Sequence, residues 1–278
     1  MSLQTSRRFL KKRRDSMPCE TDSKRIVAIT GAGGIGKEAA RRFLESGDDV
    51  ILLEHPAKIE EALQTAESLR GETGNSCIAY PCDISDRKAV KQAFEAHERE
   101  FSAIHVLVNT AGIMPDAKPL IKMDWDEMET WYDKILSVNL KGTIYTMRAV
   151  LPIMRKQNYG RIVNCASIAA FGGDAGNFYS VSKAAVARLT ARVAIEAVGG
   201  KNGATYNIRI NAVAPGIIQT PMTDDVPEKF MEPYLNRTPI HRKGTAQEVA
   251  YWIHFLASDE NTLCLGQTIT LDGGWSIA

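Results

Sequence analysis

The sequence lacks long apolar runs, closely spaced cysteines and a strong net charge, and each absence excludes a class of protein. No apolar stretch approaches the ~18 residues of a membrane-spanning helix, so no membrane span is expected. The five cysteines are scattered without a Cys-x-x-Cys pair, which argues against a disulfide framework or a zinc site and favours a reducing cytoplasm. No histidines have metal-ligand spacing, so no metal is predicted. Apolar content of 44% and a net charge of +1 are ordinary for a soluble globular protein.

The small net charge conceals a basic N-terminal segment. Residues 7–14 read Arg-Arg-Phe-Leu-Lys-Lys-Arg-Arg and contain too few apolar side chains to pack into a core. We therefore predict that residues 1–24 form a solvated, disordered tail and that residues 25–278 form one folded domain. Contact of the tail with a membrane surface or with nucleic acid remains the alternative, and we do not expect nucleic acid as a partner. No apolar region follows the basic run, unlike in a signal peptide.

The most prominent feature of the first third is a glycine-rich loop (residues 31–36) between a predicted strand and a predicted helix. Residues 25–30 are apolar and rich in β-branched types, as in a buried parallel strand. After the loop, apolar residues recur at helical spacing: Ile35, Ala39, Ala40, Phe43 and Leu44. Gly31 would permit the tight turn, Gly33 the approach of a pyrophosphate, and Gly36 close packing of helix on strand. The helix would then present free N–H groups to the phosphates.

A second predicted strand, residues 49–53, ends at Glu54. An acidic residue about 20 positions after such a loop suits the ribose hydroxyls of NAD and repels the additional phosphate of NADP. We therefore favour NAD as the cofactor. NADP is the alternative, because Lys37, His55 and Lys58 could offset the acidic charge.

Short apolar runs alternate with helical periodicity over the rest of the chain. This pattern predicts an α/β fold, a single-domain Rossmann-type doubly wound parallel sheet of about seven strands. Further strands are expected at residues 77–81, 104–109, 161–165, 208–213 and 267–271, with a long helix at 125–156 and another at 179–198. Ligands bind such sheets beyond the carboxyl ends of the strands, so the loops that follow the strands should converge there.

Tyr179 and Lys183 lie four residues apart and would share one face of a helix. A cation beside a phenol favours the ionised phenol, so Tyr179 could give a proton to a carbonyl oxygen or accept one from an alcohol. Ser167 and Asn139 supply a hydroxyl and a carboxamide upstream. This chemistry requires a hydride carrier, which the glycine-rich loop would bind.

These motifs resemble the short-chain dehydrogenase/reductase family from about residue 24 to the C-terminus. Asn139, Ser167, Tyr179 and Lys183 match the catalytic tetrad of the family. The resemblance implies that Tyr179 is the general acid and base and that Lys183 holds the nicotinamide ribose. It also implies that Ser167 donates a hydrogen bond to the substrate oxygen and that Asn139 anchors a water molecule of a proton path.

The resemblance also implies a cofactor site built from loops after successive strands. Its residues are Gly31, Gly33, Gly34, Ile35, Gly36, Glu54, Asp83, Ile84, Asn109, Ala111, Gly112, Tyr179, Lys183, Pro215, Gly216, Ile218 and Thr220. Three spacings differ from the family pattern. The glycine-rich loop is one residue shorter than usual, and so is the interval between Ser167 and Tyr179. The interval between Gly112 and Asn139 is about five residues longer than in compact members.

The family resemblance implies that residues 25–278 form one dinucleotide-binding catalytic domain. The implied activity is that of an NAD(P)(H)-dependent oxidoreductase that interconverts a carbonyl and a secondary alcohol. The substrate could be a 3-oxoacyl thioester, a sugar or a polyol, and a homotetramer is expected. The segment 217–240, which contains four prolines, is predicted to cover the substrate. A catalytically inactive cofactor-sensing or scaffold protein with the same fold is the alternative function.

Overall fold

The computed structural model describes residues 24–101, 103–114, 118–172, 176–200, 203, 205–224 and 228–278. The segment predicted as a disordered tail lies outside these residues, except for Lys24. The Lys24 ammonium donates to Asn75 Oδ1 at 2.6 Å and lies 3.5 Å from Asp49 Oδ1, so this residue is attached to the folded domain.

Seven parallel strands form the central sheet in the order β3-β2-β1-β4-β5-β6-β9, and this confirms the predicted Rossmann-type α/β fold. The strands are β1 (Ile26–Thr30), β2 (Asp49–Glu54), β3 (Cys77–Pro81), β4 (Val106–Asn109), β5 (Gly160–Cys165), β6 (Ile208–Pro215) and β9 (Thr268–Leu271). The chain reverses direction across the sheet between β1 and β4, where a doubly wound sheet opens its ligand crevice.

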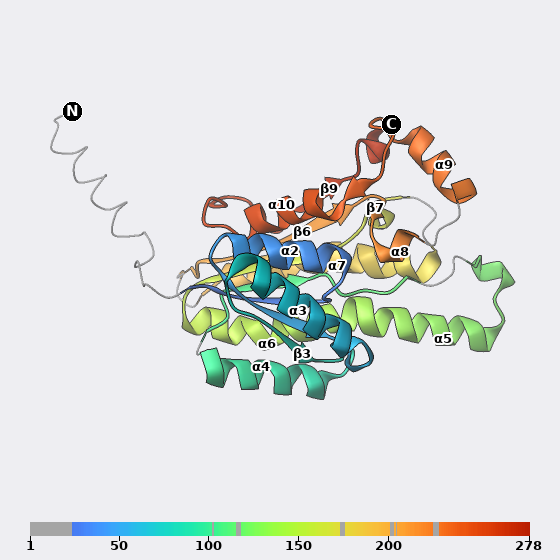
Figure 1. Cartoon of the computed structure of the whole chain (residues 1–278). Coiled ribbons are helices and arrows are strands. Elements are labelled where there is room, and N and C mark those ends of the chain that lie inside the picture. Colours follow the sequence, from blue (N-terminus) through green and yellow to red (C-terminus); the bar gives the residue numbers. More distant parts are fainter. Residues whose placement is uncertain are drawn as a thin grey trace, which may run out of the picture.

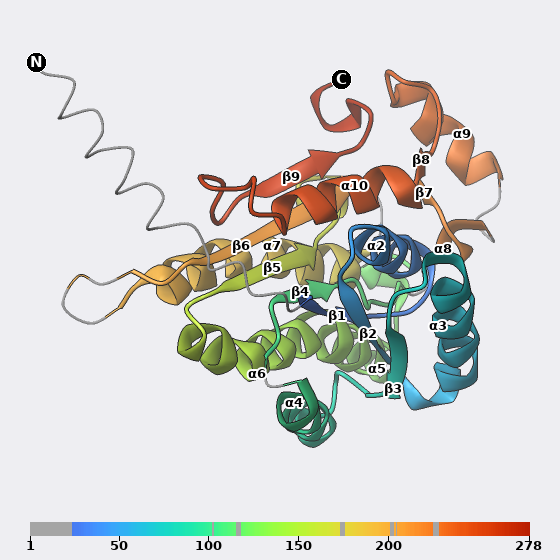
Figure 2. The same cartoon turned by 60° about the vertical axis from the view of Figure 1, so that its left-hand side comes forward.

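Helices cover both faces of the sheet (Figures 1 and 2). One face carries α2 (Gly34–Glu45), α3 (Ile59–Thr73) and α10 (Ala246–Leu256), and the other carries α4 (Arg87–Phe101), α6 (Thr143–Lys156) and α7 (Asn177–Val198). Short 3-10 turns occur at Pro56–Lys58, Leu120–Lys122, Ile168–Ala170 and Trp275–Ile277. None of the helices in the described part of the chain has the length and apolarity to cross a bilayer.

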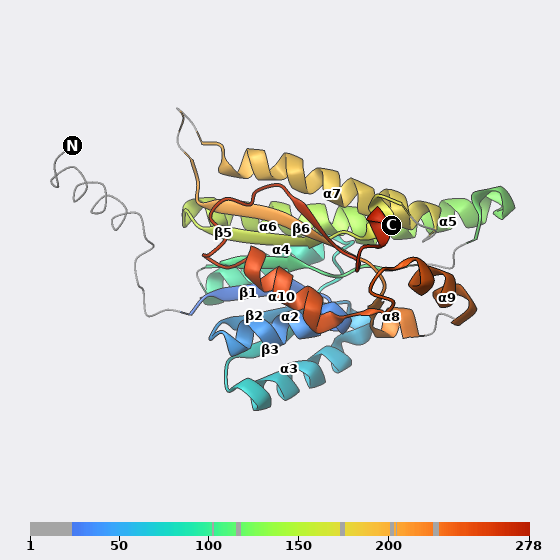
Figure 3. The same cartoon turned by 90° about the horizontal axis from the view of Figure 1, so that it is seen from above.

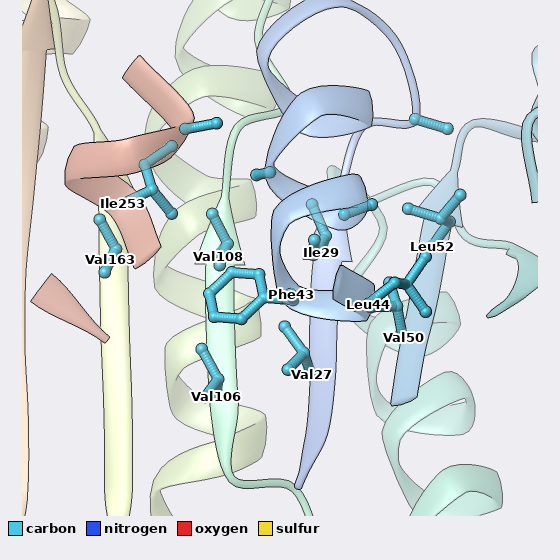
Figure 4. Close-up of a cluster of buried hydrophobic side chains, with 14 of the residues drawn as sticks. Val27, Ile29, Phe43, Leu44, Val50, Leu52, Val106, Val108, Val163 and Ile253 are labelled. Atoms are coloured by element: carbon cyan, nitrogen blue, oxygen red, sulfur yellow. The ribbon is translucent and has the colours of Figure 1, made fainter. Parts of the chain in front are cut away.

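The two faces of β1 explain why its sequence is apolar at every position. Val27 and Ile29 belong to the core under α2, whereas Ile26 and Ala28 belong to the core on the opposite face. In Figure 4 the ring of Phe43 from α2 lies over the neighbouring strands beside the β1 side chains. Full burial of such a side chain contributes about 1.5–3 kcal/mol to the free energy of unfolding. Because α2 packs on β1 in this way, the loop that joins them is held at both of its ends.

The predicted continuous helix at 125–156 is wrong in one respect, because a π-helical turn interrupts it. The chain forms α5 (Trp125–Ile135), then a π turn over Leu136–Gly142, then α6. Within this turn the side chain of Asn139 bonds the main chain of Ile113, and Gly142 lies against Ile84. Tertiary contacts therefore accompany the widened turn, as is common where π turns occur near functional residues.

The segment predicted to cover the substrate contains β7 (Ile218–Gln219), α8 (Pro221–Asp224) and α9 (Glu228–Arg237). β7 pairs with β8 (Gly244–Thr245) in a small parallel sheet that the sequence analysis did not predict. Figure 3 shows α8, α9 and the C-terminus gathered at one end of the domain. There the rings of Tyr234 and Trp275 stack with centroids 5.4 Å apart, so the C-terminal residues hold α9.

Candidate active site

The glycine-rich loop needs glycine because main-chain atoms approach it closely. A Cβ at Gly36 would collide with the Gly31 carbonyl oxygen, and one at Gly31, where φ is +84°, would lie 3.2 Å from the Ala111 nitrogen. A Cβ at Gly33 would meet nothing within 4 Å. The open side of the loop is therefore at Gly33, the N-cap of α2. A helix N-terminus with such an open approach fits a pyrophosphate.

Gly34 brings the loop against the segment that follows β6. Its φ is +46°, and a Cβ there would lie 3.1 Å from Cγ2 of Thr220. Upstream, Pro215 ends β6 and the Gly216 N–H donates to the Leu271 carbonyl at 2.9 Å. Ile218 continues into β7. The predicted cofactor residues that follow β6 therefore lie beside the loop predicted to bind the pyrophosphate.

Glu54 ends β2, and its carboxylate is held by main-chain donors. Oε2 accepts from the Ala32 N–H at 2.7 Å, and Oε1 accepts from the His55 N–H at 2.8 Å. Carboxylate oxygens have further lone pairs, so these bonds leave acceptor capacity for ribose hydroxyls. The contact with Ala32 was not predicted, because its donor is a backbone group that no residue type identifies.

Asp83 and Ile84 follow β3. Asp83 Oδ1 accepts from the N–H and the hydroxyl of Ser85 at 2.9 and 2.7 Å, and Oδ2 lies 3.8 Å from His55 Nε2. The side chain of Ile84 is buried against Gly142, where a Cβ would lie 2.6 Å from its Cδ1. Ile84 could therefore contact a cofactor only through its main chain.

Asn109 is buried at the end of β4 and belongs to a polar network inside the sheet. Its Nδ2 donates to Asn164 Oδ1 at 2.9 Å, and its Oδ1 accepts from the Thr146 hydroxyl at 2.8 Å. Asn164 in turn donates to Thr190 Oγ1 at 2.9 Å. The network ties β4, β5, α6 and α7 together. Sequence reasoning missed its other members, although buried polar residues in apolar strands are a usable signal.

Asn139, Gly112 and Lys183 meet beyond β4. Asn139 Oδ1 accepts from the Ile113 N–H at 2.8 Å, and its Nδ2 donates to the Ile113 carbonyl at 3.0 Å. A Cβ at Gly112 would lie 3.3 Å from both Asn139 Oδ1 and Lys183 Nζ. Glycine at 112 therefore permits the carboxamide and the ammonium to lie this close to the same loop.

Ser182 is a member of this group that sequence reasoning missed. Its hydroxyl accepts from Asn139 Nδ2 at 3.1 Å and donates to the Tyr179 carbonyl at 2.7 Å. It lies three residues after Tyr179 on α7, and that helical spacing is a signal that could have identified it. Ser182 thus connects the π turn to the catalytic helix.

Lys183 is buried, and its Nζ donates to the Cys165 carbonyl at 2.8 Å. The same Nζ lies 5.7 Å from the ring centroid of Tyr179. Ser167, two residues after Cys165, accepts the Ala169 N–H at 3.2 Å. Within the described residues no hydrogen bond joins Ser167 to Tyr179. The chain between them includes residues 173–175, which are not described.

The cysteines near the site have the character of buried apolar residues. Burial raises the pKa of the Cys165 thiol, although the Lys183 charge opposes this effect. Burial also raises the pKa values of Cys77 and Cys82 to about 12. These thiols are poor nucleophiles at neutral pH. Across the described ranges, no three or more His, Cys, Asp or Glu side chains are grouped so as to hold a metal ion.

The fold and the glycine-rich loop define a Rossmann-type α/β protein. The family described as Enoyl-(Acyl carrier protein) reductase matches residues 30–276. The chain is 40% identical over 253 residues to 3-oxoacyl-(acyl-carrier-protein) reductase FabG of Thermotoga maritima, covering 90% of this chain and 97% of that protein. It is 36% identical over 258 residues to 7alpha-hydroxysteroid dehydrogenase of Bacteroides fragilis, covering 91% and 95%.

A solved structure agrees with these sequence matches. A 3-oxoacyl-(acyl-carrier-protein) reductase from Brucella melitensis with bound NAD superposes with a TM-score of 0.79 at 32% identity, covering 92% of each chain. The chain belongs to the short-chain dehydrogenase/reductase family, as its motifs predicted, and is an oxidoreductase.

Proposed function

We propose that the protein uses NAD(H) or NADP(H) to interconvert a carbonyl and a secondary alcohol, with Tyr179 as general acid and base. The observation that carries the proposal is the meeting of Asn139, Gly112 and Lys183 beside Tyr179. A bound nicotinamide would supply or accept the hydride. Tyr179 would transfer the proton at the substrate oxygen, and the Lys183 ammonium would stabilise the phenolate form.

The remaining tetrad members have positioning and electrostatic roles in this proposal. Ser167 would donate a hydrogen bond to the substrate oxygen, where negative charge grows in the transition state. Asn139 fixes the main chain at Ile113 and, through Ser182, the first turns of α7. It would also anchor a water molecule on the Lys183 side that returns protons to the site.

The test is replacement of Tyr179 by Phe in the full chain. Loss of the phenolic proton should reduce turnover by about a hundredfold to ten-thousandfold, the usual contribution of positioned acid–base catalysis. Cofactor affinity, measured by quenching of protein fluorescence, should stay within about twofold of wild type because the ring remains. Unchanged turnover would contradict the role of Tyr179.

NAD is the proposed cofactor, supported by the fixed Glu54 carboxylate at the end of β2. A 2′-phosphate at that position would face a negative charge, whereas ribose hydroxyls could donate to it. NADP remains the alternative, with Lys37, His55 and Lys58 as sources of positive charge. Matched titrations of the protein with NADH and NADPH decide between them, and tighter binding of NADPH would overturn the preference.

The proposed substrate is a 3-oxoacyl thioester, because FabG of Thermotoga maritima is 40% identical and is named for that substrate class. A sugar or polyol is the second possibility, and the steroid named for the Bacteroides fragilis relative widens the range. Rates with an acetoacetyl thioester, a sugar, a polyol and a hydroxysteroid rank these classes directly. A rate with the thioester below the others would reject the first choice.

A catalytically inactive cofactor-sensing or scaffold role is the competing function. Its support is the interval between Ser167 and Tyr179, which is one residue shorter than in the family pattern, and the absence of a hydrogen bond joining these two described residues. Binding of a cofactor without turnover across the whole substrate panel would favour this role.

We also propose a homotetramer located in the cytoplasm. The support for association is the exposure of large apolar side chains along helices: Tyr132, Ile144, Val181, Ile195, Tyr251, Trp252 and Phe255. These side chains lie on α5, α6, α7 and α10, and contiguous exposed apolar patches are typical of association surfaces. Light scattering after size-exclusion chromatography tests this, and a monomer at micromolar concentration would contradict it.

A further inference from the structure

Glu54 lies where the glycine-rich loop begins. β1 and β2 are paired with Thr30 opposite Leu53, and the Gly31 N–H donates to the Leu53 carbonyl at 2.8 Å. The next amide, that of Ala32, reaches Glu54 Oε2 at 2.7 Å. Oε1 is held at 2.8 Å by the N–H of His55. The carboxylate is thus fixed at both oxygens, and one of them is bonded to the loop itself.

The loop has fixed contacts on three sides and an open one at Gly33. Gly31 lies against the main chain of Ala111, and Gly34 lies against the Thr220 side chain. Glu54 supplies the third contact through Ala32, which is only 5% exposed. Without the carboxylate the Ala32 N–H would be a buried donor lacking its partner, a condition that native loops avoid by rearranging.

The length of the loop gives this contact its importance. The loop is one residue shorter than is usual in the family, so fewer residues make the turn from β1 into α2. A glutamate at the end of β2 can reach back to the loop amide across this short turn. An aspartate there would be one methylene shorter.

We propose that Glu54 is a positioning residue for the pyrophosphate-binding loop, in addition to facing the adenosine ribose. This inference rests on the proposed cofactor site but not on the proposed substrate or proton transfer. Its consequence is that loop geometry and coenzyme preference depend on one carboxylate. A substitution at Glu54 intended to admit NADP should therefore weaken binding of both cofactors instead of exchanging one for the other.

The test compares two ligands that carry the same pyrophosphate. ADP has the ribose hydroxyls that could donate to Glu54, whereas 2′,3′-dideoxy-ADP has neither. Calorimetric titration of the full chain gives the affinity and the active fraction for the wild type and for Glu54→Gln. Glutamine has one acceptor oxygen and one NH2 group, so it cannot accept from both the Ala32 and the His55 N–H groups as the carboxylate does. If Glu54 positions the loop, Glu54→Gln should therefore weaken both ligands by a similar factor of about tenfold, the effect of losing a charge-assisted hydrogen bond.

A role confined to the ribose gives a different result. Glu54→Gln would then weaken ADP and leave dideoxy-ADP unchanged, which would overturn the proposal. Glu60→Gln removes the same charge from an exposed position on α3 and should leave both affinities unchanged. If Glu60→Gln weakens dideoxy-ADP binding as much as Glu54→Gln does, the loss of affinity comes from the change in net charge, and the proposal fails.

Glu54→Asp provides a second test that keeps the charge. Its shorter side chain should fail to reach Ala32, so dideoxy-ADP should again bind more weakly than to the wild type. Wild-type affinity for dideoxy-ADP in this variant would contradict the positioning role. Failure of the wild-type protein to bind ADP would reject the cofactor site itself. Normal ADP binding without turnover would contradict the proposed reaction and would leave the proposed role of Glu54 standing.

Discussion

Two regions at the carboxyl end of the sheet, the proposed cofactor side and the proposed substrate side, are held by different kinds of contact. On the cofactor side the closest approaches within the glycine-rich loop are between main-chain atoms, as where the Gly31 carbonyl excludes a Cβ at Gly36. On the substrate side the contacts are between side chains, as in the stack of Tyr234 on Trp275. The guanidinium of Arg237 also lies 4.1 Å over the Trp275 ring.

This difference indicates which region tolerates amino-acid substitutions. A main-chain contact tolerates no side chain, so glycine is required at fixed positions and the region is recognisable in a sequence. A side-chain contact can be replaced by another pair of similar volume without moving the chain. The cofactor side should therefore fail abruptly on substitution, whereas the substrate side should adjust with smaller losses.

The largest effect is expected for Gly36→Ala. Its Cβ would overlap the Gly31 carbonyl oxygen, so the loop must move away from α2. We expect a loss of about 3 kcal/mol or more in the free energy of unfolding, measured by urea denaturation. Gly33→Ala is the matched control, because its Cβ would meet nothing within 4 Å. Equal stability of the two variants would contradict the claim that position 36 excludes a Cβ while position 33 admits one.

The substrate side is tested by Trp275→Ala. Loss of the buried indole and of its stack with Tyr234 should loosen α9, with about 3 kcal/mol of destabilisation. We expect KM for the carbonyl substrate to rise about tenfold while the affinity for NADH changes less than about twofold. Ile277→Ala changes a 90% exposed side chain of the same segment and should be neutral. Weakened NADH binding in Trp275→Ala would show that the two sides are coupled.

Acid should destabilise the amino end of the sheet, opposite the cofactor side, at mildly low pH. His105, just before β4, accepts the Ile26 N–H at Nδ1 with a distance of 2.9 Å, which requires a neutral ring nitrogen. Burial and then the Arg25 charge lower the pKa of His105, and Asp48 opposes them. The unfolded chain therefore binds a proton near pH ~6.5 that the folded protein excludes. The free energy of unfolding should therefore fall as the pH drops below ~6.5, until the pH passes the lowered pKa of the folded protein.

Urea denaturation between pH ~8 and ~5 measures this dependence. His105→Asn keeps an acceptor without titrating, so it should flatten the profile. Burial also lowers the pKa of His254, and any slope that remains in the variant measures that second histidine. A profile that His105→Asn leaves unchanged would contradict the assignment.

The smallest effect is expected at Glu248, which forms a capping box with Thr245 at the start of α10. Bonds from Arg242 and Thr245 lower the pKa of Glu248 from 4.5 to about 2. Its stabilisation is present above the unfolded pKa and is lost as the pH falls through the folded value. Because the pair is exposed to solvent, we expect Glu248→Gln to cost about 0.5–1 kcal/mol at pH ~7. The difference from wild type should shrink at pH ~3; a constant difference would assign the effect to geometry alone.

Much of the fold could be predicted because apolar periodicity is local. The strands at 77–81 and 161–165, and the helix after the glycine-rich loop, were located to within two residues. The pairing of β7 with β8 was not predicted, since each strand has only two residues and no period to detect.

The site was predictable where residue type determines chemistry, and not where main-chain atoms act as partners. Asn139 and Lys183 were predicted from family motifs, and the structure brings them together beside Gly112. The bond from Ala32 to Glu54 was not predicted, because every residue except proline has a backbone N–H. The bond from Lys183 to the Cys165 carbonyl was missed for the same reason.

The π turn over Leu136–Gly142 has a consequence for protein engineering. One helical residue corresponds to about 100° of rotation, so the added residue in the turn shifts the phase of α6 relative to α5 by about that angle. A designer who extends the apolar spacing of α6 backwards into α5 would place apolar residues on the wrong face of α5. The apolar positions of the two helices must be assigned separately, before and after the π turn that contains Asn139.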